Sequence, residues 1–456
     1  MRQLCSNLSS CRRNKVLVCG VGFAFLAIFS AFGAASQATE SVLEETRKEK
    51  GSSFMVSGYV SLAIVYAACA IFNWISPTIV SFVKPKYAMF VGSVTYVFFL
   101  TAFFEPIAWL IYFASAVLGC GAAILWTAQG VYITACSTAT NLNRNFGIFW
   151  IIFTISNLLG GAFNYFLLSN VISITSHSRY LLYGVFTAIC TVGCVFLLML
   201  PLPKMEMQDT SESDSTVPLQ NNQDSAISVR STIAKSFHLC LSPCMLAILL
   251  ATCFTGINLA FYSGVYGTCL GRMQVFGEKA KSYIGLSGIF VGVGEIVGGQ
   301  LTAVGGNRIR PTFIMMFGFL TAILSAISTF LMVPPEAPIK ETSATGFIEP
   351  SVYLAMVIGT LLGLNDSLWN TQISALIGKI YPTNADSVAT AAAFALFKFI
   401  QSVTSAIAFF YSSVLLLHWQ LLIFMIFAIL GISGFLYADR RSTSSLSVNI
   451  TTTIPM

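Results

Sequence analysis

The stretch Trp419–Ala438 reads WQLLIFMIFAILGISGFLYA and contains no charged residue. A helix of about twenty apolar residues spans the roughly 30 Å hydrocarbon core of a bilayer, so this stretch predicts a membrane crossing. The rest of the 456-residue chain has the same character, since 56% of its residues are hydrophobic and 9% are charged. An average soluble domain has about 25% charged residues. Too few polar side chains exist to cover a water-facing surface, and the sequence therefore predicts an integral membrane protein surrounded by lipid.

Eleven further stretches have the length and composition of a membrane helix. The complete set is Val16–Ala38, Phe54–Val80, Tyr87–Phe104, Ile107–Thr134, Phe146–Leu168, Tyr180–Leu200, Met245–Cys269, Ser282–Val304, Thr312–Val333, Ser351–Ile377, Val388–Leu417 and Trp419–Ala438. They are too long and too uniformly apolar for the alternating strands of about ten residues that build a membrane β-barrel. The predicted fold class is therefore an all-α, multi-pass membrane protein with twelve transmembrane helices.

The basic residues predict the orientation of these helices. Most Lys and Arg residues fall on the side that holds both termini, and basic residues favour the cytosolic side of a membrane. The predicted organisation is a cytosolic N-terminus (1–15), a six-helix half (16–200), a cytosolic linker (201–243), a second six-helix half (244–438) and a cytosolic tail (439–456). This topology explains the formal net charge of +6, which therefore does not indicate a nucleic-acid partner.

An internal repeat relates the two halves. Three short matches occur in the same order, each six spans apart: LWTAQ (125–129) with LWNTQ (368–372), FGIF (146–149) with FALF (394–397), and YVSLA (59–63) with YIGLS (283–287). Two parallel six-helix halves joined by a cytosolic loop are typical of the major facilitator superfamily. The sequence thus predicts this fold.

The halves differ in charge. Glu295, Asp366 and Lys398 lie deep inside spans of the second half, and the repeat aligns them with Ile71, Ala123 and Trp150 of the first. All three are expected near the middle of the bilayer, where a lone charge costs at least about 2.5–3.5 kcal/mol. Such residues normally pair with one another or face water. The span around Glu295 is also rich in glycine, which predicts close approach by another helix.

Helical spacing gathers other polar residues around these charges. Neighbours on one helical face are three or four residues apart, which places Asn370 beside Asp366 and Gln401 beside Lys398. The candidate intramembrane polar or coupling site is Glu295, Asp366, Asn370, Lys398 and Gln401, with Gln37, Gln129, Asn365 and Gln372 as candidate cavity-lining residues. Two carboxylates and one ammonium leave one negative charge, which a proton or another cation would neutralise. The alternative is a direct Asp366–Lys398 or Glu295–Lys398 ion pair that only fixes helix packing.

Several motifs resemble those of one family. They are LWTAQG (125–130), NFGIFW (145–150), FYSGVYGT (261–268), GLSGIF (285–290), FALFKFIQS (394–402) and LHWQL (417–421), and the resemblance runs from about Lys15 to Ala438. Together they resemble the uncoordinated-93-like family, a divergent branch of the major facilitator superfamily. The resemblance implies a twelve-helix facilitator fold. It also implies relatives that act as regulatory partners of potassium channels or as escorts of membrane receptors.

Two loops depart from the general facilitator pattern, in which an acidic residue completes a gating motif. Ser81–Lys86 contains bases without an acid, and so does Gly305–Arg310. The first hypothesis is therefore a non-enzymatic regulatory or accessory partner of another membrane protein, such as an ion channel. The alternative is a proton- or cation-coupled secondary transporter of a small solute. No spacing of a metal site, cofactor motif or catalytic motif is present in the sequence, which predicts no cofactor and no enzyme activity.

Overall fold

The computed structural model describes residues 2–51, 54–136, 142–168, 176–201, 239–305, 309–381 and 387–451. Of the predicted linker 201–243, residues 202–238 lie outside these ranges, as do 306–308 of the second departing loop and 452–456 of the predicted tail. The first half contains α1 (Arg2–Lys50), α2 (Gly58–Asn73), α3 (Ser76–Val83), α4 (Pro85–Thr101), α5 (Ala108–Ala135), α6 (Leu142–Leu168) and α7 (Ser176–Met199). The second half contains α9 (Pro243–Ala260), the π-helix η1 (Phe261–Val265), α10 (Tyr266–Arg272), the 3₁₀ helix η2 (Gln274–Lys279), α11 (Ser282–Gly305), α12 (Pro311–Met332), α13 (Val352–Ile380), α14 (Ser387–Ser412) and α15 (Leu417–Thr451).

Ten helical segments among the described residues are long and apolar enough to cross a membrane, with α9, η1 and α10 forming one of them. Two further predicted crossings correspond to shorter helices. The 16-residue α2 stops at a turn before α3, which has a proline in its first turn, and α4 has 17 residues. Proline lacks a backbone N–H and fits only the first turn of a helix, which explains both interruptions. The chain reverses between α3 and α4 at Lys84, whose φ of 68° is left-handed.

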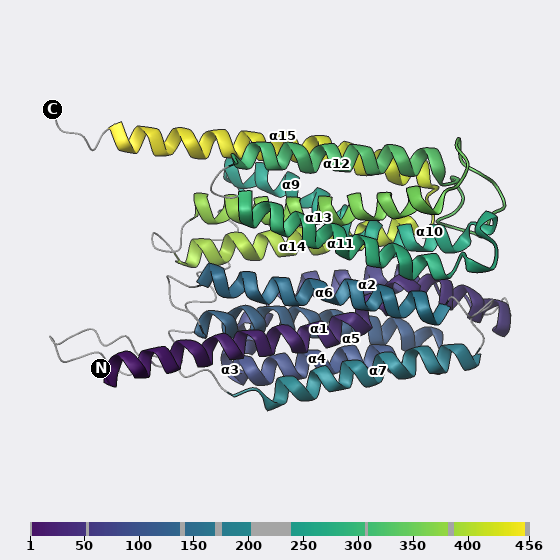
Figure 1. Cartoon of the computed structure of the whole chain (residues 1–456), viewed down its shortest axis with the longest axis horizontal. Helices are drawn as coiled ribbons and strands as arrows, with labels where there is room; N and C mark the ends of the chain where they lie inside the picture. Colours follow the sequence, from purple (N-terminus) through teal and green to yellow (C-terminus); the bar gives the residue numbers. More distant parts are fainter. Residues whose placement is uncertain are drawn as a thin grey trace.

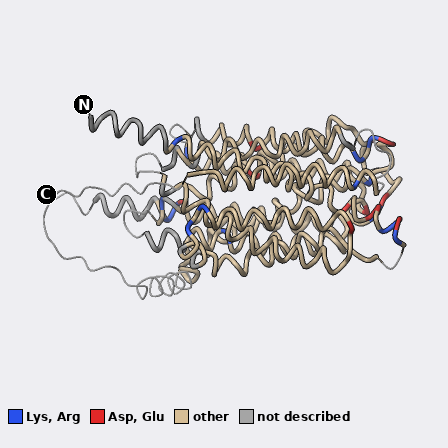
Figure 2. Tube along the Cα trace, turned by 90° about the horizontal axis from the view of Figure 1, so that it is seen from below, with Lys and Arg blue, Asp and Glu red and all other residues tan. Residues whose placement is uncertain are grey.

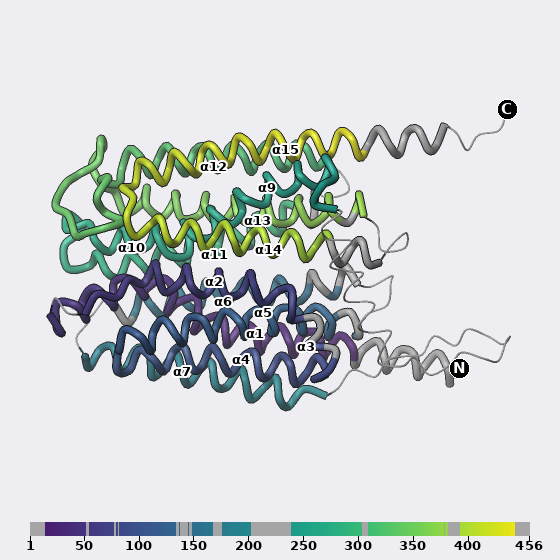
Figure 3. The backbone as a smooth tube through the Cα atoms, turned by 180° about the vertical axis from the view of Figure 1, so that it is seen from behind, coloured from purple at the N-terminus to yellow at the C-terminus, as the bar shows by residue number. Residues whose placement is uncertain are grey.

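The helices of the first half and those of the second half form two bundles that lie side by side (Figure 1 and Figure 3). One hydrophobic core belongs to the first half, and the other contains the apolar residues of the second half together with three residues of α2. The halves meet where α6 packs against α11 and where α2 packs against α14. The start of α1 and the end of α15 lie at the same end of the bundle (Figure 1). We refer to this as the termini end and to the opposite one as the far end.

The contact between α6 and α11 depends on glycine. A Cβ added at Gly161 of α6 would collide with the backbone of α11, and a Cβ at Gly285 of α11 would collide with the backbone of α6. On its other side α11 meets α13 equally closely, since a Cβ at Gly363 would collide with the carbonyl oxygen of Val291. Small residues allow membrane helices to pack backbone to backbone. The predicted close approach at this glycine-rich helix is therefore confirmed.

We expect Gly363→Ala to lower the free energy of unfolding by about 1–3 kcal/mol, because the new methyl group overpacks a helix contact. Gly130→Ala is the matched control, since nothing lies within 4 Å of the added Cβ there. Thermal unfolding of both purified variants in detergent checks this. Equal unfolding temperatures for the two variants would contradict it.

Charged residues gather at the two ends of the bundle, and the middle carries few of them (Figure 2). One helix exceeds its expected length. The sequence predicts a crossing that ends at Ala38, but α1 continues to Lys50. Its apolar segment from Asn14 to Lys50 has 37 residues, about 55 Å of helix. This is more than a bilayer core of about 30 Å, so the last turns of α1 project beyond the membrane at the far end.

Candidate functional site

Three intramembrane charges lie in the second half, on three different helices. Glu295 belongs to α11 and is 6% exposed, whereas Asp366 of α13 is half-buried and Lys398 of α14 is exposed. Asp366 interacts electrostatically with each of the other two. The three charges therefore form one electrostatic cluster inside the membrane region.

Amide side chains hold Asp366. Its Oδ1 accepts hydrogen bonds from Asn370 Nδ2 at 3.1 Å and from Asn258 Nδ2 of α9 at 3.3 Å. The Oδ1 of Asn258 in turn accepts from Asn365 Nδ2 at 3.1 Å. Hydrogen bonds to a charged group are stronger than those between neutral groups, so this arrangement fixes the carboxylate between α9 and α13.

A relay of amides joins Asp366 to Lys398. Lys398 Nζ donates to Gln401 Oε1 at 2.9 Å, and Gln401 Nε2 donates to Asn370 Oδ1 at 2.9 Å. Gln401 also donates to Thr255 of α9 at 3.1 Å. Neither carboxylate lies within 4.0 Å of the lysine nitrogen in the described structure, so the direct ion pair considered as an alternative is wrong for both Asp366–Lys398 and Glu295–Lys398.

Glu295, near the middle of α11, connects the two halves. Its Oε2 accepts a hydrogen bond of 2.8 Å from Asn157 Nδ2, which belongs to α6 of the first half. The Tyr262 side chain of η1 lies beside the same carboxyl group. A change in the spacing of the halves would therefore break a hydrogen bond to a buried acid.

The remaining sequence candidates lie in different places. Asn365 is fully buried in the cluster next to Asp366. Gln37 is buried on α1 close to Gly288 of α11, and its Oε1 has no hydrogen-bond partner in the described part of the chain. Gln129 and Gln372 are buried, but the structure shows no hydrogen bond from either described side chain to the cluster. The structure thus brings together Glu295, Asp366, Asn370, Lys398, Gln401 and Asn365.

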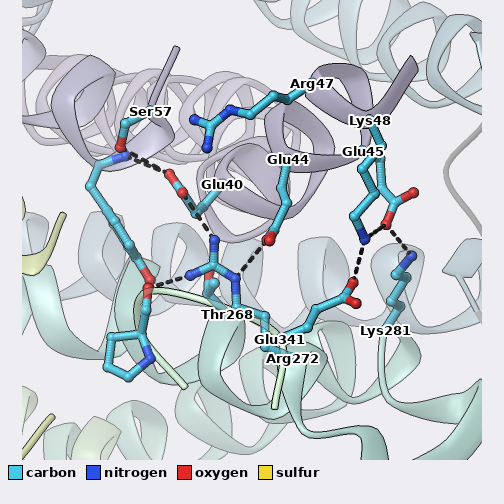
Figure 4. A network of polar contacts seen from close by, with 12 residues as sticks. Glu40, Glu44, Glu45, Arg47, Lys48, Ser57, Thr268, Arg272, Lys281 and Glu341 are labelled. Atoms are coloured by element: carbon cyan, nitrogen blue, oxygen red, sulfur yellow. Dashed lines mark hydrogen bonds and ion pairs between the residues drawn. The ribbon is translucent and has the colours of Figure 1, made fainter. Parts of the chain in front are cut away.

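A second polar network joins the halves at the far end (Figure 4). Arg272, the last residue of α10, donates from Nε to Glu44 at 2.7 Å and from Nη2 to Glu40 at 3.1 Å, and it also donates to the carbonyl oxygen of Pro338. Alongside, Glu45 accepts from Lys281 at 2.9 Å, and Lys48 donates to Glu341 at 2.7 Å. We call this network the far-end clamp, and it consists of Glu40, Glu44, Glu45, Lys48, Arg272, Lys281 and Glu341.

Burial makes Arg272 the centre of the far-end clamp. Its side chain is 4% exposed, and those of Glu40 and Glu44 are 12% and 19% exposed. The second oxygen of Glu40 accepts from the Ser57 hydroxyl and from the backbone N–H of Tyr59, at the start of α2. Sequence reasoning missed this network because it ended the first crossing at Ala38, before these acids. Their spacing of four residues, Glu40 to Glu44, is the signal that places both on one helical face.

The far-end clamp should weaken in strong acid. Burial alone would raise the pKa of Glu45, but hydrogen bonds and charges from Lys281 and Lys48 outweigh it and hold that pKa below the ordinary value of 4.5. A carboxylate with a lowered folded-state pKa stabilises the fold above its unfolded pKa, and this contribution is lost as pH falls through the folded value. We therefore expect the stability difference between the wild type and Glu45→Gln to be constant near neutrality and to shrink below pH 4.5.

Thermal unfolding of the purified proteins across a pH series measures that difference. Glu336→Gln is the matched control, because Glu336 pairs with Lys340 at the exposed surface of the same end. A difference between the wild type and Glu45→Gln that grows with acid would contradict the expectation.

The paired six-helix halves define a protein of the major facilitator superfamily fold. A mutant of the nucleoside transporter NupG matches with a TM-score of 0.65 at 12% identity, over 92% of this chain and 99% of that one. A POT family transporter in complex with a thioalcohol-conjugated peptide matches with a TM-score of 0.64 at 13% identity, over 94% and 96%. At these identities the two likenesses show the fold alone.

Within that fold the chain belongs to the UNC-93 family. The family model described as ion channel regulatory protein UNC-93 matches residues 51–436. The chain is 37% identical to UNC93-like protein MFSD11 of Xenopus laevis over 433 residues, which cover 93% of this chain and 95% of that protein. It is 26% identical to UNC93-like protein 3 of Arabidopsis thaliana, over 93% and 85%. The family predicted from the motifs is confirmed, and with it a multi-pass membrane protein.

Proposed function

We propose that this chain is a secondary transporter that couples the movement of a small solute to a proton or another cation. The observation that carries the proposal is the cluster of Glu295, Asp366 and Lys398, two acids and one base on three helices. The amides of Asn370 and Gln401 join Asp366 to Lys398, and Glu295 accepts a hydrogen bond from the other half. Ionisable residues inside a membrane mark ion and substrate pathways. A structural role alone would be served better by apolar packing, which is often as stable as a buried ion pair.

The two connections between the halves support a carrier mechanism. The far-end clamp holds the halves together at one end, and the Asn157–Glu295 hydrogen bond holds them in the middle. The Lys398 side chain remains exposed, which agrees with access from the termini end. In this proposal both termini are cytosolic, the far end faces the opposite compartment, and transport requires the far-end clamp to open.

Proteoliposomes test the carrier function without knowledge of the solute. The purified protein is reconstituted, exposed to a small-molecule extract with and without a proton gradient, and the vesicle contents are identified by mass spectrometry. We expect at least one solute to accumulate only with protein and with a gradient. Accumulation equal to that in protein-free vesicles, under gradients of either direction and with sodium or potassium substituted, would reject the carrier function.

A second function is favoured by the family description, which names ion channel regulation. In this reading the chain is a non-enzymatic accessory partner of another membrane protein such as an ion channel, and the lipid-facing helices provide the contact surface. The absence of an acid in Ser81–Lys86 supports it, because the usual gating motif of a carrier is incomplete there. Proximity labelling in cells, followed by co-purification, tests it. Failure to recover any stoichiometric membrane partner would count against this function.

A further inference from the structure

The hydrogen bonds around Asp366 leave acceptors in excess. The amide nitrogens of Asn258, Asn370 and Gln401 each donate within the cluster. Asn365 also donates its Nδ2, yet its Oδ1 is fully buried and has no partner among the described residues. An unsatisfied buried acceptor is costly, so this position fits a ligand that brings a donor.

The charges around the same position are also incomplete. Glu295 and Asp366 together exceed the single charge of Lys398, which is occupied with Gln401 Oε1 and lies 4.7 Å from the ring centre of Phe397. A ligand with one positive charge would bring the net charge of this cluster to zero. Burial of an uncompensated charge is unfavourable. A cationic ligand, which makes the net charge of cluster and ligand zero, is therefore favoured over a neutral or anionic one.

Aromatic side chains from both halves flank the acids. Tyr66 of α2 interacts electrostatically with Asp366 and stacks on Phe409 of α14 with ring centres 5.5 Å apart. Tyr262 of η1 lies beside the carboxyl group of Glu295 and within range of the charge of Asp366. Tyr66, Tyr262 and Asp366 are all partly exposed, so a ligand can reach them. Aromatic faces attract organic cations and also bind apolar groups, whereas a bare metal ion prefers oxygen ligands alone.

We propose that Asp366, Glu295, Asn365, Tyr66 and Tyr262 form a binding site for a small organic cation, an amine whose ammonium group meets the acids and whose apolar body meets the tyrosines. The ammonium supplies the donors that the cluster lacks, and its charge balances the excess acid. That the transported solute is an organic cation rests on the proposed carrier function. Binding of the cation to the site is measured separately from transport.

The test uses three matched probes of similar size: 2-phenylethylamine, which is cationic; 2-phenylethanol, which is neutral; and 3-phenylpropanoate, which is anionic. Each is titrated into purified full-length protein at neutral pH while the thermal unfolding temperature is recorded. We expect a saturable increase with the amine alone. Asp366→Asn and Glu295→Gln should raise the amine concentration for half effect by at least about tenfold, because each removes a charge partner of the ammonium group. Glu336→Gln and Asp439→Asn, acids outside the site and outside the far-end clamp, should leave it unchanged.

Four outcomes overturn the site: no increase with the amine, an equal increase with the alcohol, a preference for the anion, or an amine effect that survives in both site variants. Uptake of radiolabelled amine by proteoliposomes then separates the two proposals. Amine binding by a protein that takes up neither the amine nor any solute of the extract rejects the carrier function and leaves the site standing. Gradient-driven uptake of other solutes by a protein that does not bind the amine rejects the site and leaves the carrier function standing.

Discussion

Arg272→Met is expected to be the most destabilising single change at the far end. It leaves the carboxylates of Glu40 and Glu44 buried without their cation, and removal of one partner from a buried ion pair costs about 3–5 kcal/mol. Most of this effect is the penalty for the charges left behind. The measurement is the thermal unfolding temperature of the purified variant, which should fall by several degrees.

Lys340→Met is the matched control for Arg272→Met. Lys340 pairs with Glu336 at 2.8 Å at the same end, but its side chain is 63% exposed. An exposed ion pair contributes about 0–1 kcal/mol, so the control should unfold near the wild-type temperature. If the two variants lose stability equally, burial does not set the strength of the far-end clamp.

Asp366→Asn and Lys398→Met should each abolish gradient-driven uptake while the protein remains folded and correctly inserted. Both changes keep the size of the side chain and remove one charge of the proposed coupling cluster. Without that charge, the protonation or cation occupancy of the site no longer changes with the position of the halves. Uptake into proteoliposomes, normalised to the amount of folded protein by size-exclusion chromatography, measures the loss.

The same substitutions at a second pair provide the control. Lys379 and Asp439 form an ion pair of 3.2 Å near the termini end, and Lys379→Met and Asp439→Asn should retain uptake. Wild-type uptake in both Asp366→Asn and Lys398→Met would remove these residues from the mechanism, even if the chain is a carrier.

Hydrophobicity and the internal repeat predicted the fold, because both can be read from the order of residues in the sequence. The matched residues also have related positions. Trp369 is fully buried and packs on Phe254 at 4.3 Å, and its counterpart Trp126 lies in an aromatic cluster with Phe29 and Trp150. Individual crossings were less predictable. A proline and a turn divide α2 from α3, and a span that sequence treats as continuous is a broken one.

The candidate site was predictable where its contacts are local. Asn370 beside Asp366 and Gln401 beside Lys398 follow from helical spacing, and the structure has both contacts. The partner of Glu295 was not predictable, since Asn157 lies 138 residues away in the other half. The sequence analysis placed the accessory-partner hypothesis first, because that hypothesis follows from the family resemblance. The arrangement of the charges gives more support to the transporter.

The far-end clamp was missed for a physical reason. A run of Glu, Lys and Arg after an apolar span was interpreted as a loop, yet these residues favour helices, so α1 continues through them. The helix then places Glu40 and Glu44 one turn apart and facing α10. No spacing along the chain links them to Arg272, which is 228 residues from Glu44. The contact between Glu44 and Arg272 exists only because α1 of the first half packs against α10 of the second half.

The unbroken course of α1 has a mechanical consequence. A single helix runs from Arg2 to Lys50, and it carries Gln37 about one turn before Glu40, the first acid of the far-end clamp. Because hydrogen bonds run along the whole length of an α-helix, a displacement of its last turns also moves the part of the helix within the membrane. An antibody fragment bound only to the projecting turns would therefore shift the position of α1 within the membrane without entering the membrane.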